Sequence, residues 1–166
     1  MRRVHVTDVE LASATELPPV VRTIEVARSA KDAFRIFTEE TLAWWPQTRT
    51  RARSALGEKT AAITIEPRTG GRVYETVSTG EEIDWGEVVA FQPPSRFAMR
   101  FWMAFPREQG GDVEVRFEPL GAERCRVTLS HAGWERFGAE ANAVRERFVP
   151  GWAEVFDNAF GSYAGA

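Results

Sequence analysis

The sequence predicts a single α+β domain in which a curved antiparallel sheet wraps around a long C-terminal helix. Three observations lead to this prediction. The middle of the chain is a run of short apolar–polar segments separated by Gly- and Pro-containing turns. Residues 137–163 keep an apolar spacing of three to four residues, which is typical of a long amphipathic helix. The length of 166 residues is that of one domain.

The beginning of the domain is expected at residue 20. Residues 1–19 alternate weakly and end in two prolines, so we interpret them as an N-terminal tail and residues 20–166 as the domain. Residues 20–26 alternate as a strand does. Ser29 then starts a capping-box-like sequence that predicts a short helix. Residues 39–45 predict a second short helix, which the proline at 46 ends.

The strands of the predicted sheet fill the middle of the chain. We expect them at residues 60–66, 72–77, 83–91, 96–103, 113–118 and 124–131. The last two alternate cleanly between apolar and polar side chains, which is typical of an antiparallel sheet with one buried face. Strands that follow one another through short turns are also what a sheet needs in order to curl.

The C-terminal helix contains an internal proline. Pro150 is followed by Gly151, and a proline inside a helix removes one backbone hydrogen bond. We therefore expect a kink, or a break between two helices, near Val149.

The composition excludes several classes of protein. A formal net charge of −3 does not provide the basic surface that nucleic-acid binding requires. Arg49, Arg51 and Arg53 are interpreted as solvated loop charges. Cys125 is the single cysteine, which excludes an internal disulfide and fits a reducing compartment. No stretch is long and apolar enough to span a membrane. We expect a cytoplasmic protein that contacts neither nucleic acid nor membrane.

The order of the elements and several short motifs resemble a known family. The motifs include Trp85-Gly86-Glu87-Val88 and the stretch from Val127 to Trp134. They resemble the bacterial proteins similar to the C-terminal domain of the activator of the 90-kDa heat-shock protein ATPase, within the START-like (SRPBCC) superfamily. The resemblance covers about residues 20–163. It implies a helix-grip fold with a cavity between the concave face of the sheet and the long helix, and it implies no catalytic set of residues.

The aromatic content supports such a cavity. Aromatic residues make up 11% of the chain, and each large ring must fill the core or line a pocket. The candidate ligand-binding residues are Trp45, Trp85, Glu87, Phe97, Met99, Phe101, Phe117, His131, Trp152 and Phe156.

The sequence alone does not decide which face of its strand Glu87 occupies. If the face that carries Trp85 and Val89 is concave, the Glu87 carboxylate enters an aromatic pocket, and desolvation raises its pKa. If the other face of the strand is concave, Glu87 lies in water, and this is the interpretation that we favour. Glu75 and Arg100 raise the same question on their own strands.

His131 shares a strand face with Cys125 and Leu129 and therefore points toward the core or the cavity. It could act as an acid or a base, but we expect a core histidine held by one hydrogen bond. Cys125 is expected to be a small buried hydrophobe. Two isolated histidines and one cysteine do not have the spacing of metal ligands, so we expect no metal, and we expect no cofactor.

Three functions remain. The first is binding of a small, largely hydrophobic molecule in the cavity. The second is a cyclase- or hydratase-like pocket enzyme of the same fold that uses His131 or Glu87. The third is a chaperone cofactor or stress-response interaction module, which rests on the name of the family alone. A homodimer is compatible with all three.

Overall fold

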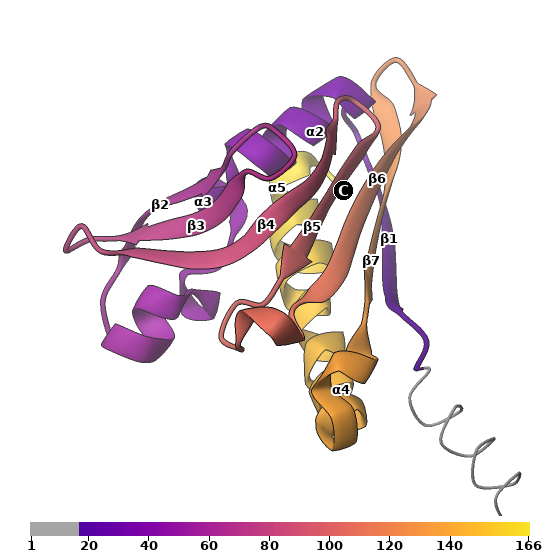
Figure 1. Cartoon of the computed structure of the whole chain (residues 1–166). Helices are drawn as coiled ribbons and strands as arrows, with labels where there is room; N and C mark the ends of the chain where they lie inside the picture. The colour runs from indigo at the N-terminus through magenta and orange to yellow at the C-terminus, as the bar shows by residue number, and fades with distance from the viewer. Residues whose placement is uncertain (1–16) are drawn as a thin grey trace, which may run out of the picture.

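A single antiparallel sheet organises the structure, a computed structural model that describes residues 17–166 (Figure 1). Most of the expected N-terminal tail lies outside these residues. The sheet has seven strands in the order β1-β7-β6-β5-β4-β3-β2, so the first strand pairs with the last. The strands are β1 (Val20–Val26), β2 (Thr60–Ile65), β3 (Arg72–Val77), β4 (Glu82–Gln92), β5 (Arg96–Phe101), β6 (Gly111–Gly121) and β7 (Arg124–Ala132).

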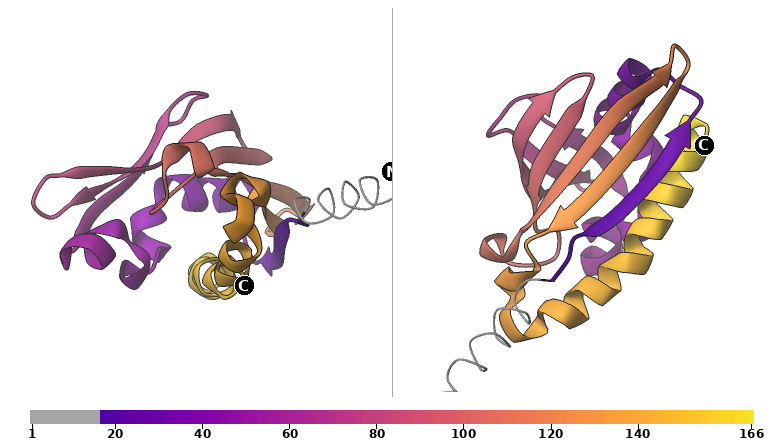
Figure 2. Two further views of the ribbon diagram at one scale, coloured as in Figure 1. Left: turned by 60° about the horizontal axis from the view of Figure 1, so that its bottom comes forward. Right: turned by 90° about the vertical axis from the view of Figure 1, so that its right-hand side faces the viewer.

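The helices all lie on the concave side or at the ends of the sheet (Figures 1 and 2). Helix α2 begins where the sequence predicts, because Ser29 Oγ accepts a hydrogen bond of 3.1 Å from the backbone N–H of Asp32. No helix within residues 17–166 is long and apolar enough to cross a membrane. The helical segments are α2 (Ala30–Glu39), α3 (Thr41–Trp44), η1 (Gln47–Arg49), η2 (Ala52–Leu56), η3 (Arg107–Gln109), η4 (Trp134–Glu140), α4 (Ala141–Trp152), η5 (Ala153–Phe160) and α5 (Gly161–Ala164).

The C-terminal helix is continuous through Pro150. Segments α4, η5 and α5 follow one another without a gap, and Figure 2 shows a single curved ribbon. Of the kink or break that we expected near Val149, the break is absent, and the helix instead curves as one continuous ribbon. It adopts the wider π-helical pattern in η5, which begins at Ala153, three residues after the proline. The interruption lies earlier, inside η4, where Gly138 has a φ of 58° and kinks the chain before α4 begins.

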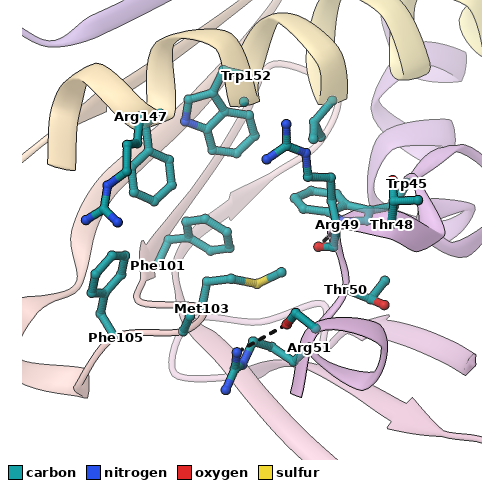
Figure 3. A pocket seen from close by; sticks show the side chains of 15 residues that line it. Trp45, Thr48, Arg49, Thr50, Arg51, Phe101, Met103, Phe105, Arg147 and Trp152 are labelled. Carbon is teal, nitrogen blue, oxygen red and sulfur yellow. Dashed lines mark hydrogen bonds between the residues drawn. The ribbon is translucent and has the colours of Figure 1, made fainter. Parts of the chain in front are cut away.

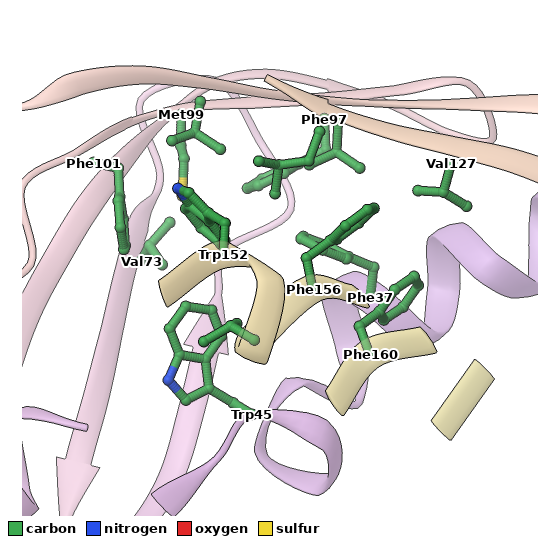
Figure 4. Packing of buried hydrophobic residues seen from close by; sticks show 14 of the residues in the cluster. Phe37, Trp45, Val73, Phe97, Met99, Phe101, Val127, Trp152, Phe156 and Phe160 are labelled. Atoms are coloured by element: carbon green, nitrogen blue, oxygen red, sulfur yellow. The ribbon is translucent and has the colours of Figure 1, made fainter. Parts of the chain in front are cut away.

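The core fills the space between the concave face and the helices, as Figure 4 shows. Phe156 and Phe160 of the long helix are fully buried. Phe160 packs edge-on against Phe37 of α2 at 5.2 Å between ring centres, and Phe37 also packs against Phe97 and Phe117 of the sheet. This grip of a curved sheet on a long helix, with two short helices after the first strand, confirms the expected α+β helix-grip fold.

Two bulges in β4 decide the direction of its side chains. The pairing with β3 skips Trp85, and the pairing with β5 skips Val89. The first bulge buries Trp85 together with its neighbour Gly86, which a regular strand would place on opposite faces. Glu87 opposes Arg100 on the outer face of the sheet. Glu87 therefore points outward, as we favoured from the sequence, but the Trp85 ring is buried as well.

A matched pair of leucines tests the core. Leu129 in β7 is fully buried, whereas Leu120 near the end of β6 is 39% exposed. We expect Leu129→Ala to lower the free energy of unfolding by about 2–5 kcal/mol, because a cavity replaces packed atoms. Leu120→Ala should change it by about 0.5 kcal/mol or less. Urea denaturation of the two variants measures the difference, and equal losses would contradict the burial of Leu129.

Candidate functional site

A cavity of about 300 Å³ lies beside the long helix, at the end of the sheet where the core is not filled. Its walls come from residues 45–54, from the end of β5 and the turn that follows it, and from residues 147–155 of the long helix (Figure 3). Most of the lining is apolar and aromatic. The apolar side chains in the walls are those of Trp45, Phe101, Met103, Ala104, Phe105, Phe148, Trp152 and Val155.

Three of these aromatic rings contact one another across different elements. Trp152 of α4 packs edge-on against Trp45, with 6.2 Å between ring centres. Phe101 at the end of β5 lies 5.8 Å from Trp152. Trp45 is held in turn by the hydrogen bond of 3.1 Å that its indole N–H donates to the Arg49 carbonyl. The rings are therefore fixed in place as a wall and cannot easily collapse into the space that they border.

The side chain of Glu75 anchors the part of the cavity wall that contains Arg51. Its side chain is fully buried on β3 and accepts four hydrogen bonds. The backbone N–H groups of Arg51 and Ala52 donate at 2.6 and 3.1 Å, the Thr60 hydroxyl at 2.7 Å and the Trp85 indole at 2.7 Å. A carboxylate without such donors would be too costly to bury. Glu75 therefore ties the start of η2 to the sheet.

His131 supports Trp152 from behind the cavity. The Trp152 indole N–H donates to His131 Nδ1 at 3.0 Å. The imidazole lies 4.2 Å from the centre of the Trp134 ring and 4.8 Å from that of Phe148. Burial lowers the pKa of His131 to about 3, so the ring is neutral and free to accept this hydrogen bond. The arrangement orients Trp152 toward the cavity.

The polar part of the lining consists of hydroxyl groups and arginines. Arg49 forms two hydrogen bonds with Glu154, at 2.9 and 3.1 Å, which link η1 to the long helix. These bonds lower the pKa of Glu154 and raise that of Arg49. Arg51 donates to Ser54 Oγ at 3.2 Å. Arg147 projects from the long helix.

The structure brings three of the ten candidate ligand-binding residues into the cavity wall: Trp45, Phe101 and Trp152. Glu87 lies on the outer face, in an ion pair with Arg107. The others are buried around the wall or deeper in the core. These are Trp85, Phe97, Met99, Phe117, His131 and Phe156.

Several lining residues were missed or misinterpreted from the sequence. Arg49 and Arg51, interpreted as solvated loop charges, lie in the wall. β5 ends at Phe101, two residues before the predicted end of this strand at Met103, so Met103 and Phe105 lie in the turn that follows it and line the cavity. The available signal was an arginine pair four and six residues after Trp45. Cys125 is buried as expected, and desolvation raises the pKa of its thiol to about 11.

The role of Glu75 is tested with Glu75→Gln. The amide nitrogen of glutamine replaces an oxygen that faces donors, so at least one donor loses its partner. We expect a loss of about 1–3 kcal/mol in the free energy of unfolding. The amide protons of Arg51 and Ala52 should also exchange faster with solvent. Glu81→Gln, at an exposed site in the turn between β3 and β4, is the control and should change neither quantity. Unchanged exchange in Glu75→Gln would contradict the anchoring role.

The buried His131 makes stability depend on pH. The unfolded chain binds a proton near pH 6.5, whereas the folded protein does so only near pH 3. Stability is therefore complete above pH 6.5 and falls as the pH is lowered toward 3. Between pH 7 and pH 5 we expect this group to account for a loss of about 2 kcal/mol. Urea denaturation of the wild type and of His131→Gln at several pH values measures this loss. It is the difference between the two proteins in how steeply the free energy of unfolding changes with pH. An NMR titration of folded His131 with a midpoint near pH 6.5 would refute this.

Comparison with known proteins adds to this geometry. A search among curated proteins finds no match. Among solved structures, an anthrahydroquino-gamma-pyrone synthase is 28% identical with a TM-score of 0.59, over 89% of this chain and 97% of its own. The self-sacrificing resistance protein CalC from Micromonospora echinospora is 24% identical with a TM-score of 0.67, over 90% and 97%. An Hsp90 activator from Plasmodium falciparum is 17% identical with a TM-score of 0.56, over 84% and 91%. The last two likenesses concern the fold alone.

The family assignment rests on the sequence itself. Residues 27–165 match the family described as "Activator of Hsp90 ATPase homolog 1-like protein", which covers the domain from the end of β1 to the end of α5. The solved structures above share the same fold over most of their lengths. The chain therefore belongs to the family of activator of Hsp90 ATPase homolog 1-like proteins, within the START-like superfamily.

Proposed function

We propose that the protein binds a small, largely hydrophobic molecule in the cavity between the sheet and the C-terminal helix. The observation that carries the proposal is a space of about 300 Å³ bordered by aromatic side chains from separate elements. This volume is at the lower end of the range for small-molecule pockets, which are usually apolar with a few polar groups. A compact molecule with a small ring system fits such a space.

The lining favours an aromatic ligand. Trp45, Phe101, Phe105 and Trp152 border the cavity from different directions, and Phe148 also lines it. Aromatic rings contact one another favourably in edge-on and offset arrangements, beyond the burial of their area. The likeness to a synthase of an anthrahydroquino-gamma-pyrone, which is an aromatic product, supports the same class of ligand.

A pocket enzyme that relies on His131 or Glu87 has less support. His131 lies behind Trp152, outside the lining, and its imidazole already accepts a hydrogen bond from that residue. Glu87 lies on the outer face of the sheet and pairs with Arg107. Neither group can reach a molecule in the cavity, which acid–base catalysis requires.

Gly151 offers a direct test, because it lines the cavity and has no atom within 4 Å of the position of an added Cβ. Gly151→Ala should leave binding nearly unchanged and raise stability by about 0.5–1 kcal/mol, because alanine is the better helix former. Gly151→Leu should fill the cavity and keep the fold. The probe is 2-naphthamide, a neutral aromatic molecule, and binding is measured by calorimetry and by quenching of tryptophan fluorescence.

We expect the wild type and Gly151→Ala to bind 2-naphthamide, and Gly151→Leu to lose at least about tenfold in affinity. Circular dichroism and thermal unfolding check that all three proteins are folded. Equal binding by Gly151→Leu would place the probe outside the cavity and reject the proposal. Failure of the wild type to bind either 2-naphthamide or its acid, 2-naphthoate, would reject it as well.

A further inference from the structure

Two arginines in the cavity wall have no acidic partner among residues 17–166. Within residues 17–166, most arginines form ion pairs with Asp or Glu, including Arg49 with Glu154 beside the cavity. Arg51 and Arg147 line the cavity, and neither guanidinium group forms an ion pair with a carboxylate of residues 17–166. The lining formed by the described residues contains no Asp or Glu. The cavity therefore carries positive charge, although the whole chain has a net charge of −3.

Arg51 is the better positioned of the two. Its backbone N–H donates to Glu75 Oε1 at 2.6 Å, so the buried carboxylate fixes the point from which the side chain extends. The residue is half-buried, and Arg51 Nη1 donates only to Ser54 Oγ, at 3.2 Å. The remaining N–H groups of a guanidinium can bind both oxygens of a carboxylate in a planar pair. Arg147 is exposed and belongs to the opposite wall, on α4.

We propose that the ligand of this cavity is an aromatic carboxylate, with its ring system against Trp45, Phe101 and Trp152 and its carboxylate paired with Arg51. Arg147 adds positive potential at the opening and contacts the ligand less directly. This inference rests on the proposed function and specifies the class of ligand. The partly enclosed, apolar surroundings strengthen such a pair relative to one in open water.

A pair of matched probes separates the two ideas. Both 2-naphthoate and 2-naphthamide present the same ring system, but only the naphthoate carries a negative charge at pH 7. We expect the wild type to bind naphthoate about tenfold more tightly, in keeping with a hydrogen-bonded charge pair. Added salt should weaken naphthoate binding and leave naphthamide binding unchanged.

Three variants assign the preference to Arg51. Arg51→Gln should remove the tenfold preference for naphthoate over naphthamide. Arg51→Lys keeps the charge without the planar fork, so it should retain part of the preference. Arg53→Gln is the matched control, because Arg53 is an exposed residue of the same short helix and lies outside the lining. Arg147→Gln should reduce the preference about two- to threefold through the weaker field at the opening.

The outcomes distinguish the two proposals. Equal affinity of the wild type for both probes would overturn the aromatic carboxylate and leave the binding function standing. Binding of neither probe would overturn the binding function itself. A preference that survives in Arg51→Gln, or that Arg53→Gln removes to the same extent, would overturn the role of Arg51. Thermal unfolding of each variant verifies that these differences do not come from loss of the fold.

Discussion

The Glu75 carboxylate is fully buried on the concave face of the sheet, surrounded by four hydrogen-bond donors from the sheet and from the segment that follows α3. Removing a carboxylate from water is costly, and the donors offset that cost only if all of them stay in place. The start of η2 is therefore held at a set distance from β3. Arg51 makes one of these contacts through its backbone N–H, so the position of the polar wall of the cavity depends on Glu75.

A second polar contact, between His131 and Trp152, joins the sheet to the long helix. Like the Glu75 contact, it orients a residue that borders the cavity. At the other end of the sheet, Phe156 and Phe160 pack tightly against α2 and the strands, and the core is closed. Gly151 lines the cavity beside Trp152 and adds no side chain to the space. The helix therefore passes the cavity without filling it and without being divided at Pro150.

The charges around the cavity complement its apolar walls. The pair between Arg49 and Glu154 connects η1 to η5 and neutralises one arginine. Arg51 and Arg147 line the cavity without an ion pair within residues 17–166, which is the basis of the proposed aromatic carboxylate ligand. Membership of the family does not specify a ligand, so the proposed aromatic carboxylate rests on this combination of rings and arginines.

The sequence alone determined the elements of the fold, because alternation in the strands, the Ser29 cap and the spacing of the long helix depend on neighbouring residues. It also identified Trp45, Phe101 and Trp152 as candidates that line the cavity. Only the tertiary structure decided the rest. The bulge at Trp85 changes which residues of β4 face inward, and the partners of Glu75 come from three separate segments. A cavity is space that elements distant in sequence leave between them, so no local pattern predicts which side chains border it.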